Sequence, residues 1–222
     1  MYTKTKDYSM YLAGEWTAGE SEARMEATSP ATGEQIGTVP EGTRADVERA
    51  IAAANKAWSG WANLSAFERA AAMIRIAEII EERRDDLAET LTLDQGKPLV
   101  AEAYDEVDEL VAYFEMASAD VTRLEGSMPP SVDADKRVML YRVPRWVVGV
   151  ISPWNWPYTM PAELIAPALA CGNAVVWVPA PSTSVCAVKL AECLVDAGLA
   201  PHRHSGPVSG YVLQETGSSD SL

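Results

Sequence analysis

Basic residues, cysteines and long apolar runs are all scarce in this sequence of 222 residues. Lysine and arginine together number 18 against 32 aspartates and glutamates, which gives a formal net charge of −14. This balance argues against a nucleic-acid partner and against a polybasic membrane anchor, because both depend on clustered positive charge. No stretch of about 18 uninterrupted apolar residues is present, so we expect no transmembrane helix and no membrane partner.

The cysteines are too few and too unevenly spaced for a disulfide framework or a common zinc site. They are Cys171, Cys186 and Cys193. We interpret them as small buried hydrophobic residues in a reducing compartment, and we predict no metal site. The N-terminal residues lack the apolar run of a secretory signal peptide, so we expect a cytoplasmic protein.

What the sequence contains is an ordinary globular composition, with 48% hydrophobic and 23% charged residues. Turn residues break positions 8–40 into short strands, which we expect to form hairpins. Two capping boxes then mark helix starts, one pairing Thr43 with Asp46 and the other Ser65 with Glu68. The sequence therefore begins with strands and continues into a helical segment.

The end of the helical segment is strongly acidic. One predicted helix runs from about residue 85 to Gly96, and Pro98 lies in the first turn of the next, which reaches residue 123. Positions 81–125 hold 14 acidic and 4 basic residues. We expect these charges on solvated outer helix faces.

Residues 144–199 differ in character, with only five charged residues. Two continuous apolar runs, 147–151 and 174–178, alternate with predicted helices at 160–170 and 184–197. Strands that are apolar on both faces and alternate with helices are typical of a parallel sheet covered on both sides. The predicted fold class is α/β, an incomplete doubly wound (Rossmann-like) parallel sheet with N-terminal β-hairpins and a long-helix segment.

The predicted parallel sheet stops after two strands, because the polar, serine-rich residues 201–222 read as a disordered tail. An unfinished sheet edge can pair with a second copy or another polypeptide, so a non-catalytic interaction module remains an alternative, as does a fragment that binds a nucleotide without catalysis. We divide the chain into hairpins (1–40), a helical part (41–125), a strand arm serving oligomerisation (126–143), a βαβα core (144–200) and the divergent tail (201–222).

Ligands of open α/β sheets bind beyond the carboxyl ends of the strands, where two loops qualify here. In the first, residues 152–157, prolines and two tryptophans surround Asn155. A rigidly held asparagine can donate its amide to a developing oxyanion, but it can equally bond loop backbone, and spacing alone favours neither reading. The second loop, residues 179–183, leads into a helix whose N-terminus can receive a phosphate or a ribose. An ordinary N-cap by Ser182 or Thr183 is the favoured reading there.

Several segments, in the same order along the chain, resemble the aldehyde dehydrogenase superfamily over about residues 8–200. They are 29–34 (Ser-Pro-Ala-Thr-Gly-Glu), 95–98 (Gln-Gly-Lys-Pro), 149–157 (Gly-Val-Ile-Ser-Pro-Trp-Asn-Trp-Pro) and 167–173 (Pro-Ala-Leu-Ala-Cys-Gly-Asn). The resemblance implies oxidation of a small-molecule aldehyde to a carboxylic acid with NAD or NADP, by attack of a cysteine thiolate.

The same resemblance implies roles for individual residues. Asn155 would be the oxyanion-hole amide. The residues implied to contact the cofactor are Ile151, Ser152, Pro153, Trp154 and Asn155 in the first loop, and Val178, Pro179, Ala180 and Pro181 in the second.

The sequence also departs from the family pattern. Val178 stands where the family usually has a ribose-binding lysine, Pro181 where many NAD-preferring members have glutamate, and Trp146 where glycine is usual. The family's Gly-Ser-Thr segment, its general-base glutamate and its nucleophilic cysteine have no counterpart here. The resemblance therefore implies an N-terminal portion without the catalytic domain, and we expect the isolated chain to be inactive.

Overall fold

The computed structural model describes residues 6–199 and 208–211, with side chains described for the first range only. The strands before the helical segment are β1 (Lys6–Asp7), β2 (Met10–Leu12), β3 (Glu15–Thr17), β4 (Arg24–Thr28) and β5 (Gln35–Pro40). The later strands are β6 (Val147–Ile151), β7 (Ala174–Val178) and β8 (Val208–Tyr211). The α-helices are α1 (Arg44–Ala62), α2 (Ala66–Glu82), α3 (Arg84–Asp94), α4 (Tyr104–Val121), α5 (Thr159–Ala170) and α6 (Ser184–Leu194).

The central sheet has five strands in the order β3-β2-β8-β7-β6. β6 and β7 pair in parallel with Val147 opposite Ala174, as the two apolar runs predict. The expectation that the sheet stops after these two strands is wrong, because β8 adds to β7 in parallel and joins β2 antiparallel. The sequence of β8, Val-Ser-Gly-Tyr, carries no apolar run that would reveal it. The remainder of the predicted disordered tail lies outside the described residues.

The predicted hairpins are present, as β2 pairs with β3 and β4 with β5. Both predicted capping boxes begin helices, Thr43 with Asp46 at α1 and Ser65 with Glu68 at α2. Pro98 differs from its predicted place. It precedes the first turn with ψ 125°, and residues Leu99–Ala103 form a π-helical turn before α4. A proline there cannot donate a hydrogen bond, which suits the position just before a helix.

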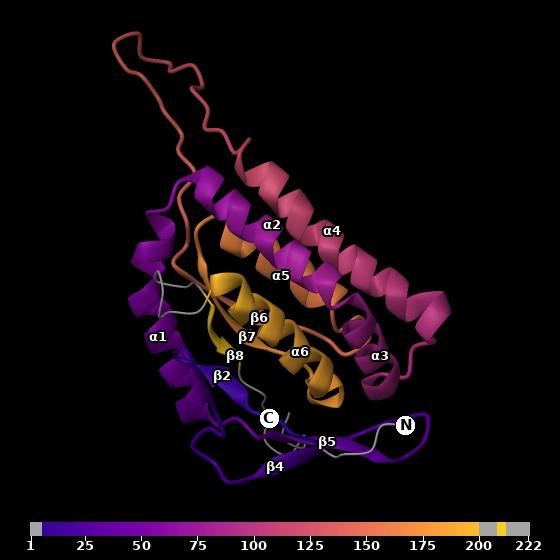
Figure 1. The fold of residues 1–222 in the computed structure, drawn as a ribbon. Helices are drawn as coiled ribbons and strands as arrows, with labels where there is room; N and C mark the ends of the chain where they lie inside the picture. Colours follow the sequence, from indigo (N-terminus) through magenta and orange to yellow (C-terminus); the bar gives the residue numbers. More distant parts are fainter. Residues whose placement is uncertain (1–5, 200–207, 212–222) are drawn as a thin grey trace.

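The helices form layers around the sheet (Figure 1). α1 packs along β8 and β7, while the crossover helices α5 and α6 lie on the other side, as Figure 1 shows. α2 and α4 pack along each other and cover α5, so they make an outer layer. The indole N–H of Trp61 on α1 donates to the Leu169 carbonyl at 2.8 Å in the buried interior. The two βα units are therefore held between helices from the first half of the chain.

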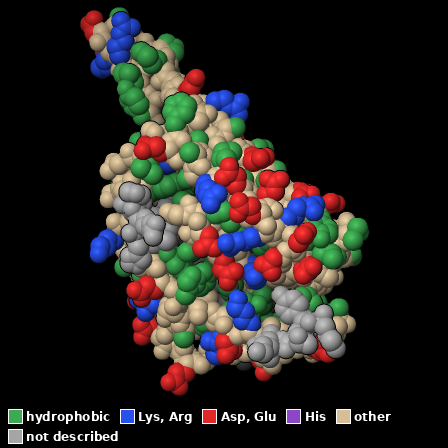
Figure 2. Space-filling model, in the orientation of Figure 1, with side chains coloured by type: hydrophobic (Ala, Val, Ile, Leu, Met, Phe, Trp, Pro, Cys, Tyr) green, Lys and Arg blue, Asp and Glu red, His purple; other side chains and the backbone are tan. Residues whose placement is uncertain are grey.

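The segment between α4 and β6 extends away from the body as an arm (Figure 1). The predicted strand at 138–143 does not form. The arm has a single bridge, in which Ser127 and Leu140 exchange backbone hydrogen bonds of 3.2 and 2.8 Å. Figure 2 shows apolar side chains along this arm. Tyr141 and Val143, which belong to it, are exposed. With no second strand or core to pack on, an apolar run alone does not fix a strand.

The strand β6 is an edge of the sheet and is covered less than expected. β7 is buried along most of its length, whereas Gly149 and Ile151 on β6 are exposed, Ile151 to 82%. Just before β6, Trp146 adopts a φ of +72°, a conformation that favours glycine. This explains physically why a glycine suits the position where this chain has tryptophan.

Candidate functional site

The loop after β6 places Asn155 at the surface, beyond the carboxyl end of the strand. Asn155 is exposed between Trp154 and Trp156, which are 58% and 37% exposed. Among the described residues, no hydrogen-bond partner is found for the Asn155 side-chain amide. The alternative in which this amide only bonds the loop backbone therefore has no hydrogen bond to support it. The amide is therefore free to meet a ligand at this sheet edge.

The start of the same loop is anchored in the core. Ser152 is buried, and its hydroxyl accepts the indole N–H of Trp177 on β7 at 2.8 Å. The backbone N–H of Ser152 also donates to the Val178 carbonyl at 3.3 Å. These bonds continue the β6–β7 pairing past the strand ends. The loop therefore leaves the sheet from a fixed point.

The end of the loop is held by Glu106, a residue that the sequence reading missed. Glu106 lies on α4 and is fully buried, and its Oε1 accepts the backbone N–H of Tyr158 at 2.9 Å and of Thr159 at 3.3 Å. These are the first donors of α5, which has no side-chain cap of its own. The partners are 52 and 53 residues apart, so no local pattern signals the contact.

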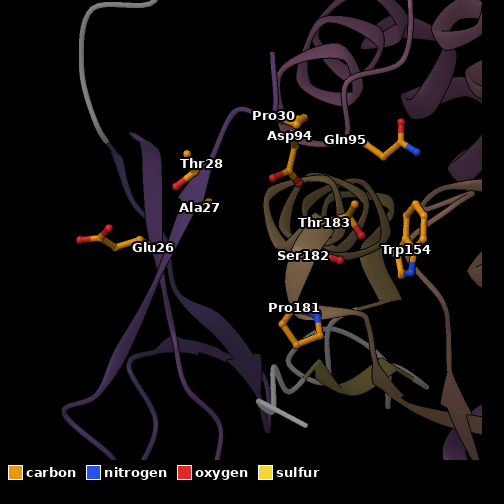
Figure 3. Close-up of a pocket in the computed structure, with 10 residues that line it drawn as sticks. All are labelled: Glu26, Ala27, Thr28, Pro30, Asp94, Gln95, Trp154, Pro181, Ser182 and Thr183. Atoms are coloured by element: carbon orange, nitrogen blue, oxygen red, sulfur yellow. The ribbon is translucent and has the colours of Figure 1, made fainter. Parts of the chain in front are cut away.

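A groove of about 510 Å³ runs around the N-terminus of α6 (Figure 3). In Figure 3, strand β4 lies on one side, the turn Pro181–Thr183 in the middle and Trp154 on the other side. The groove is lined by Glu26, Ala27, Thr28, Pro30, Asp94, Gln95, Trp154, Pro181, Ser182 and Thr183. Both loops at the carboxyl ends of the strands therefore border one cavity, where the sheet topology places ligands.

Only some of the residues that the family resemblance implies for cofactor binding line this groove. Trp154 and Pro181 line the groove, whereas the other residues implied in the two loops do not. Of these, Pro153 and Ile151 are exposed, Ser152 and Pro179 are buried, and Val178 and Ala180 are half-buried. Only these two of the implied cofactor residues therefore border the groove.

The N-cap predicted at the second loop is right in position only. Thr183 occupies the N-cap position of α6, but neither its hydroxyl nor that of Ser182 makes a capping hydrogen bond. Instead, Asp94 at the end of α3 accepts the backbone N–H of Cys186 at 2.9 Å. Burial raises the pKa of Asp94 to about 6, although hydrogen bonds from Cys186 and Val185 favour its charged form. The carboxylate of Asp94 thus occupies the N-terminus of α6, where the sequence left phosphate binding as the alternative to an N-cap.

The cysteines are placed as the sequence reading predicts, in or near the core. Cys186 and Cys193 are buried, and burial raises the pKa of Cys193 to about 11 and that of Cys186 well above its ordinary value. Cys171 is half-buried. Thiols kept protonated by burial are poor nucleophiles. Within the described residues, no cluster suits a metal ion and no helix is long and apolar enough to cross a membrane.

Comparison with known proteins gives one consistent result. The model of the aldehyde dehydrogenase family matches residues 16–203. Glutarate-semialdehyde dehydrogenase of Pseudomonas putida is 40% identical over 189 residues, which cover 85% of this chain and 39% of that protein. The structure of succinate-semialdehyde dehydrogenase from Burkholderia pseudomallei matches with a TM-score of 0.88 and 39% identity, over 94% of this chain and 42% of that one.

A structure of an NAD-dependent aldehyde dehydrogenase from Sinorhizobium meliloti matches equally well, with a TM-score of 0.88, 31% identity and coverage of 96% of this chain and 42% of that one. The chain thus spans about two fifths of the length of the relatives that it matches. NAD or NADP is the cofactor of the family, and matched structures are described as dependent on one or the other. The fold, the order of motifs and these matches together show that the chain belongs to the aldehyde dehydrogenase family.

Proposed function

We propose that this chain supplies the oxyanion donor and part of the cofactor crevice of an NAD(P)-dependent aldehyde dehydrogenase. The observation that carries the proposal is the exposed, unbonded amide of Asn155 at the carboxyl end of β6, next to the groove beside Trp154. Attack of a nucleophile on an aldehyde places negative charge on the carbonyl oxygen. A fixed amide donor aimed at that oxygen stabilises the transition state by about 2.7–4 kcal/mol.

The groove suits the uncharged parts of a dinucleotide. Trp154 offers a flat apolar surface, and the hydroxyls of Ser182 and Thr183 can bond a ribose. NAD or NADP, when bound, accepts hydride from the substrate carbon. Our proposal is that Trp154 and the turn at 181–183 hold and orient that cofactor.

The charges around the groove favour NAD over NADP. No lysine or arginine lines it among the described residues, while Glu26 and Asp94 do. Val178 also has no charge with which to bind a 2′-phosphate. A second phosphate in this setting would meet carboxylates without a compensating cation.

These 222 residues alone are proposed not to turn over an aldehyde. Covalent catalysis needs a thiolate aligned with substrate and cofactor. Burial raises the pKa of the Cys186 and Cys193 thiols and so keeps them protonated, and neither residue is among those that line the groove. The proposed role is therefore binding and charge stabilisation, completed by residues outside this chain.

Calorimetric titration of the purified chain tests this role. We expect heat from NAD binding at millimolar cofactor, weaker binding of NADP, and a loss of NAD binding in Trp154→Ala. The same protein mixed with NAD and short semialdehydes should form no NADH. Absence of any heat with NAD would remove the proposed cofactor site, and steady NADH formation would overturn the proposed inactivity.

A role of the arm in assembly is a second proposal, favoured by its exposed apolar side chains. Tyr141 and Val143 are each more than 70% exposed on a segment that packs on little of the body. We propose that the arm pairs with a second copy of the chain. Light scattering after size-exclusion chromatography should give at least a dimer, and Tyr141→Asp with Val143→Asp should give a monomer. A monomeric unaltered chain would contradict this proposal.

A further inference from the structure

Beneath the Asn155 loop lies a buried ion pair between Lys97 and Glu106. The ammonium of Lys97 is 2.6 Å from Oε2 of Glu106, and the two side chains are 7% and 0% exposed. Among the ion pairs of the described residues, it is the only one with both side chains buried. Burying two charges costs several kcal/mol per ion, which good geometry and additional hydrogen bonds offset.

The additional bonds all lead to the loop. The other oxygen of Glu106 accepts the N–H groups of Tyr158 and Thr159, which follow the loop directly. The ammonium of Lys97 also lies over the ring of Trp156, 3.4 Å from its centroid. A cation over an indole face is attracted by the electron density of the ring. One ion pair thus holds the loop at two points on the C-terminal side of Asn155.

A third contact reaches Asn155 itself. The side-chain amide of Gln95 donates to the backbone carbonyl of Asn155 at 3.4 Å. Gln95 and Lys97 belong to the same short connection after α3, and Glu106 lies on α4. The backbone of the loop is therefore fixed from a neighbouring layer, while the Asn155 side-chain amide stays unbonded.

Capping α5 alone does not require this arrangement. A serine or aspartate next to the helix start satisfies such N–H groups at the surface without burying an ion pair, as Ser65 does at α2. What the ion pair adds is a cation in contact with the indole adjacent to Asn155. An oxyanion donor needs this kind of fixed surrounding, because a displacement of about 1 Å can cost a hundredfold in rate.

We propose that Lys97 and Glu106 are positioning residues for Asn155, holding its backbone so that the free amide faces the reacting oxygen. This inference rests on the proposed role of Asn155 as oxyanion donor. It assigns a function to a charged pair of which neither residue is among those that line the groove.

Nuclear magnetic resonance of the full chain tests the positioning without any turnover. In the unaltered protein, the ε-methylene protons of Lys97 should be shifted upfield by the Trp156 ring. The double variant Lys97→Gln with Glu106→Gln keeps an acceptor for the two α5 amides but removes the cation. We expect the Tyr158 and Thr159 amides to keep their exchange protection to within about tenfold, since one neutral hydrogen bond replaces another. The Trp156 indole and the Asn155 side-chain amide signals should move and broaden.

Arg84 with Asp108 provides a matched control. This exposed pair also combines a cation, a carboxylate at 2.5 Å and an aromatic ring, that of Tyr104 at 4.3 Å. It sits at the opposite end of α3 from the connection that holds the loop. Arg84→Gln with Asp108→Asn should leave the Asn155 and Trp156 signals unchanged.

The outcomes separate the two proposals. Unchanged Asn155 and Trp156 signals in the Lys97/Glu106 double variant would overturn the positioning role, even in a chain that binds NAD. The expected signal changes in a chain that binds no NAD would support the positioning and remove the proposed cofactor site. Equal changes in the control variant would also overturn the positioning role, because they would show a general loosening of the fold.

Discussion

The two crossover helices of the βαβα core begin in the same way but in different electrostatic settings. α5 receives Glu106 from α4, and α6 receives Asp94 from the end of α3, so each buried carboxylate accepts backbone N–H groups from across the structure. Glu106 is paired with Lys97, whereas Asp94 has no ion pair among the described residues. The loop beside the paired carboxylate carries the free Asn155 amide. The unpaired carboxylate borders the groove.

A carboxylate from a distant part of the chain can accept the first N–H groups of a helix as a local cap does, and it also links two layers of the fold. Burial alone pushes the pKa of Asp94 up to about 6, because nothing positive offsets the loss of water. Glu106 instead has the ammonium of Lys97 at 2.6 Å, and the same ammonium contacts Trp156. A buried carboxylate thus accepts N–H groups at the start of both crossover helices, and the Lys97 ammonium paired with Glu106 also contacts the Asn155 loop through Trp156.

The largest expected loss of stability comes from removing only one partner of the Lys97–Glu106 ion pair. Lys97→Met leaves Glu106 as a buried, uncompensated charge, which typically costs about 3–5 kcal/mol. Urea unfolding of the variant and the unaltered chain measures the loss. The Lys97→Gln, Glu106→Gln double variant should recover most of it. A loss below about 1 kcal/mol for Lys97→Met would show that the pair is not desolvated as described.

A smaller loss of stability is expected when Asp94, the carboxylate without an ion pair, is replaced. Asp94→Ala removes the acceptor from the buried start of α6 and leaves the N–H of Cys186 without a partner, at a cost of about 1–3 kcal/mol. Chemical unfolding at pH 7 checks this, with Asp94→Asn as the control that keeps an acceptor oxygen. If the alanine and asparagine variants were equally stable, the capping role of Asp94 would be contradicted.

The unpaired site should also make stability depend on pH. The pKa of Asp94 is about 6 in the folded chain and lower when unfolded, so folding favours its protonated form. The contribution of this protonation to the free energy of unfolding is fully present below the pKa of the unfolded chain, and it is lost as pH rises through about 6. Unfolding free energies measured from pH 4 to 8 should show this decline, and Asp94→Asn should flatten it. An identical slope in both proteins would contradict the assignment.

The smallest effect is expected for the exposed pair of Arg84 and Asp108. Their side chains are 37% and 55% exposed, and water and salt screen exposed pairs of this kind, so they contribute little to stability. Arg84→Met should therefore change the unfolding free energy much less than Lys97→Met does, and less still in high salt. A loss as large as that of Lys97→Met would show that burial is not what separates the two pairs.

Much of the framework follows from the sequence because its causes are local. The capping boxes at Thr43 and Ser65 join residues three apart, and the apolar runs of β6 and β7 predict two paired parallel strands. The loop with Asn155 is also located by its position after β6. The family resemblance then points to the chemistry of that loop.

What the sequence does not reveal depends on distant parts of the chain. Asp94 meets Cys186 across 92 positions, so Ser182 and Thr183 look like better caps than they are. Glu106 looks like one of many acidic residues on a charged helix, yet it is buried. β8 is formed by pairing with β7 and β2 on either side rather than by its own composition. Tertiary contacts decided each of these cases.

A chimera gives the most direct test of the account. Residues 1–199 of this chain, joined to the remaining portion of the Pseudomonas putida glutarate-semialdehyde dehydrogenase, would supply a nucleophile to the Asn155 site. Steady-state kcat should fall by about 100–1,000-fold in Asn155→Ala, as expected for loss of an oxyanion donor, with little change in the KM for aldehyde. A kcat within threefold of the unaltered chimera would contradict the claim that this amide stabilises the transition state.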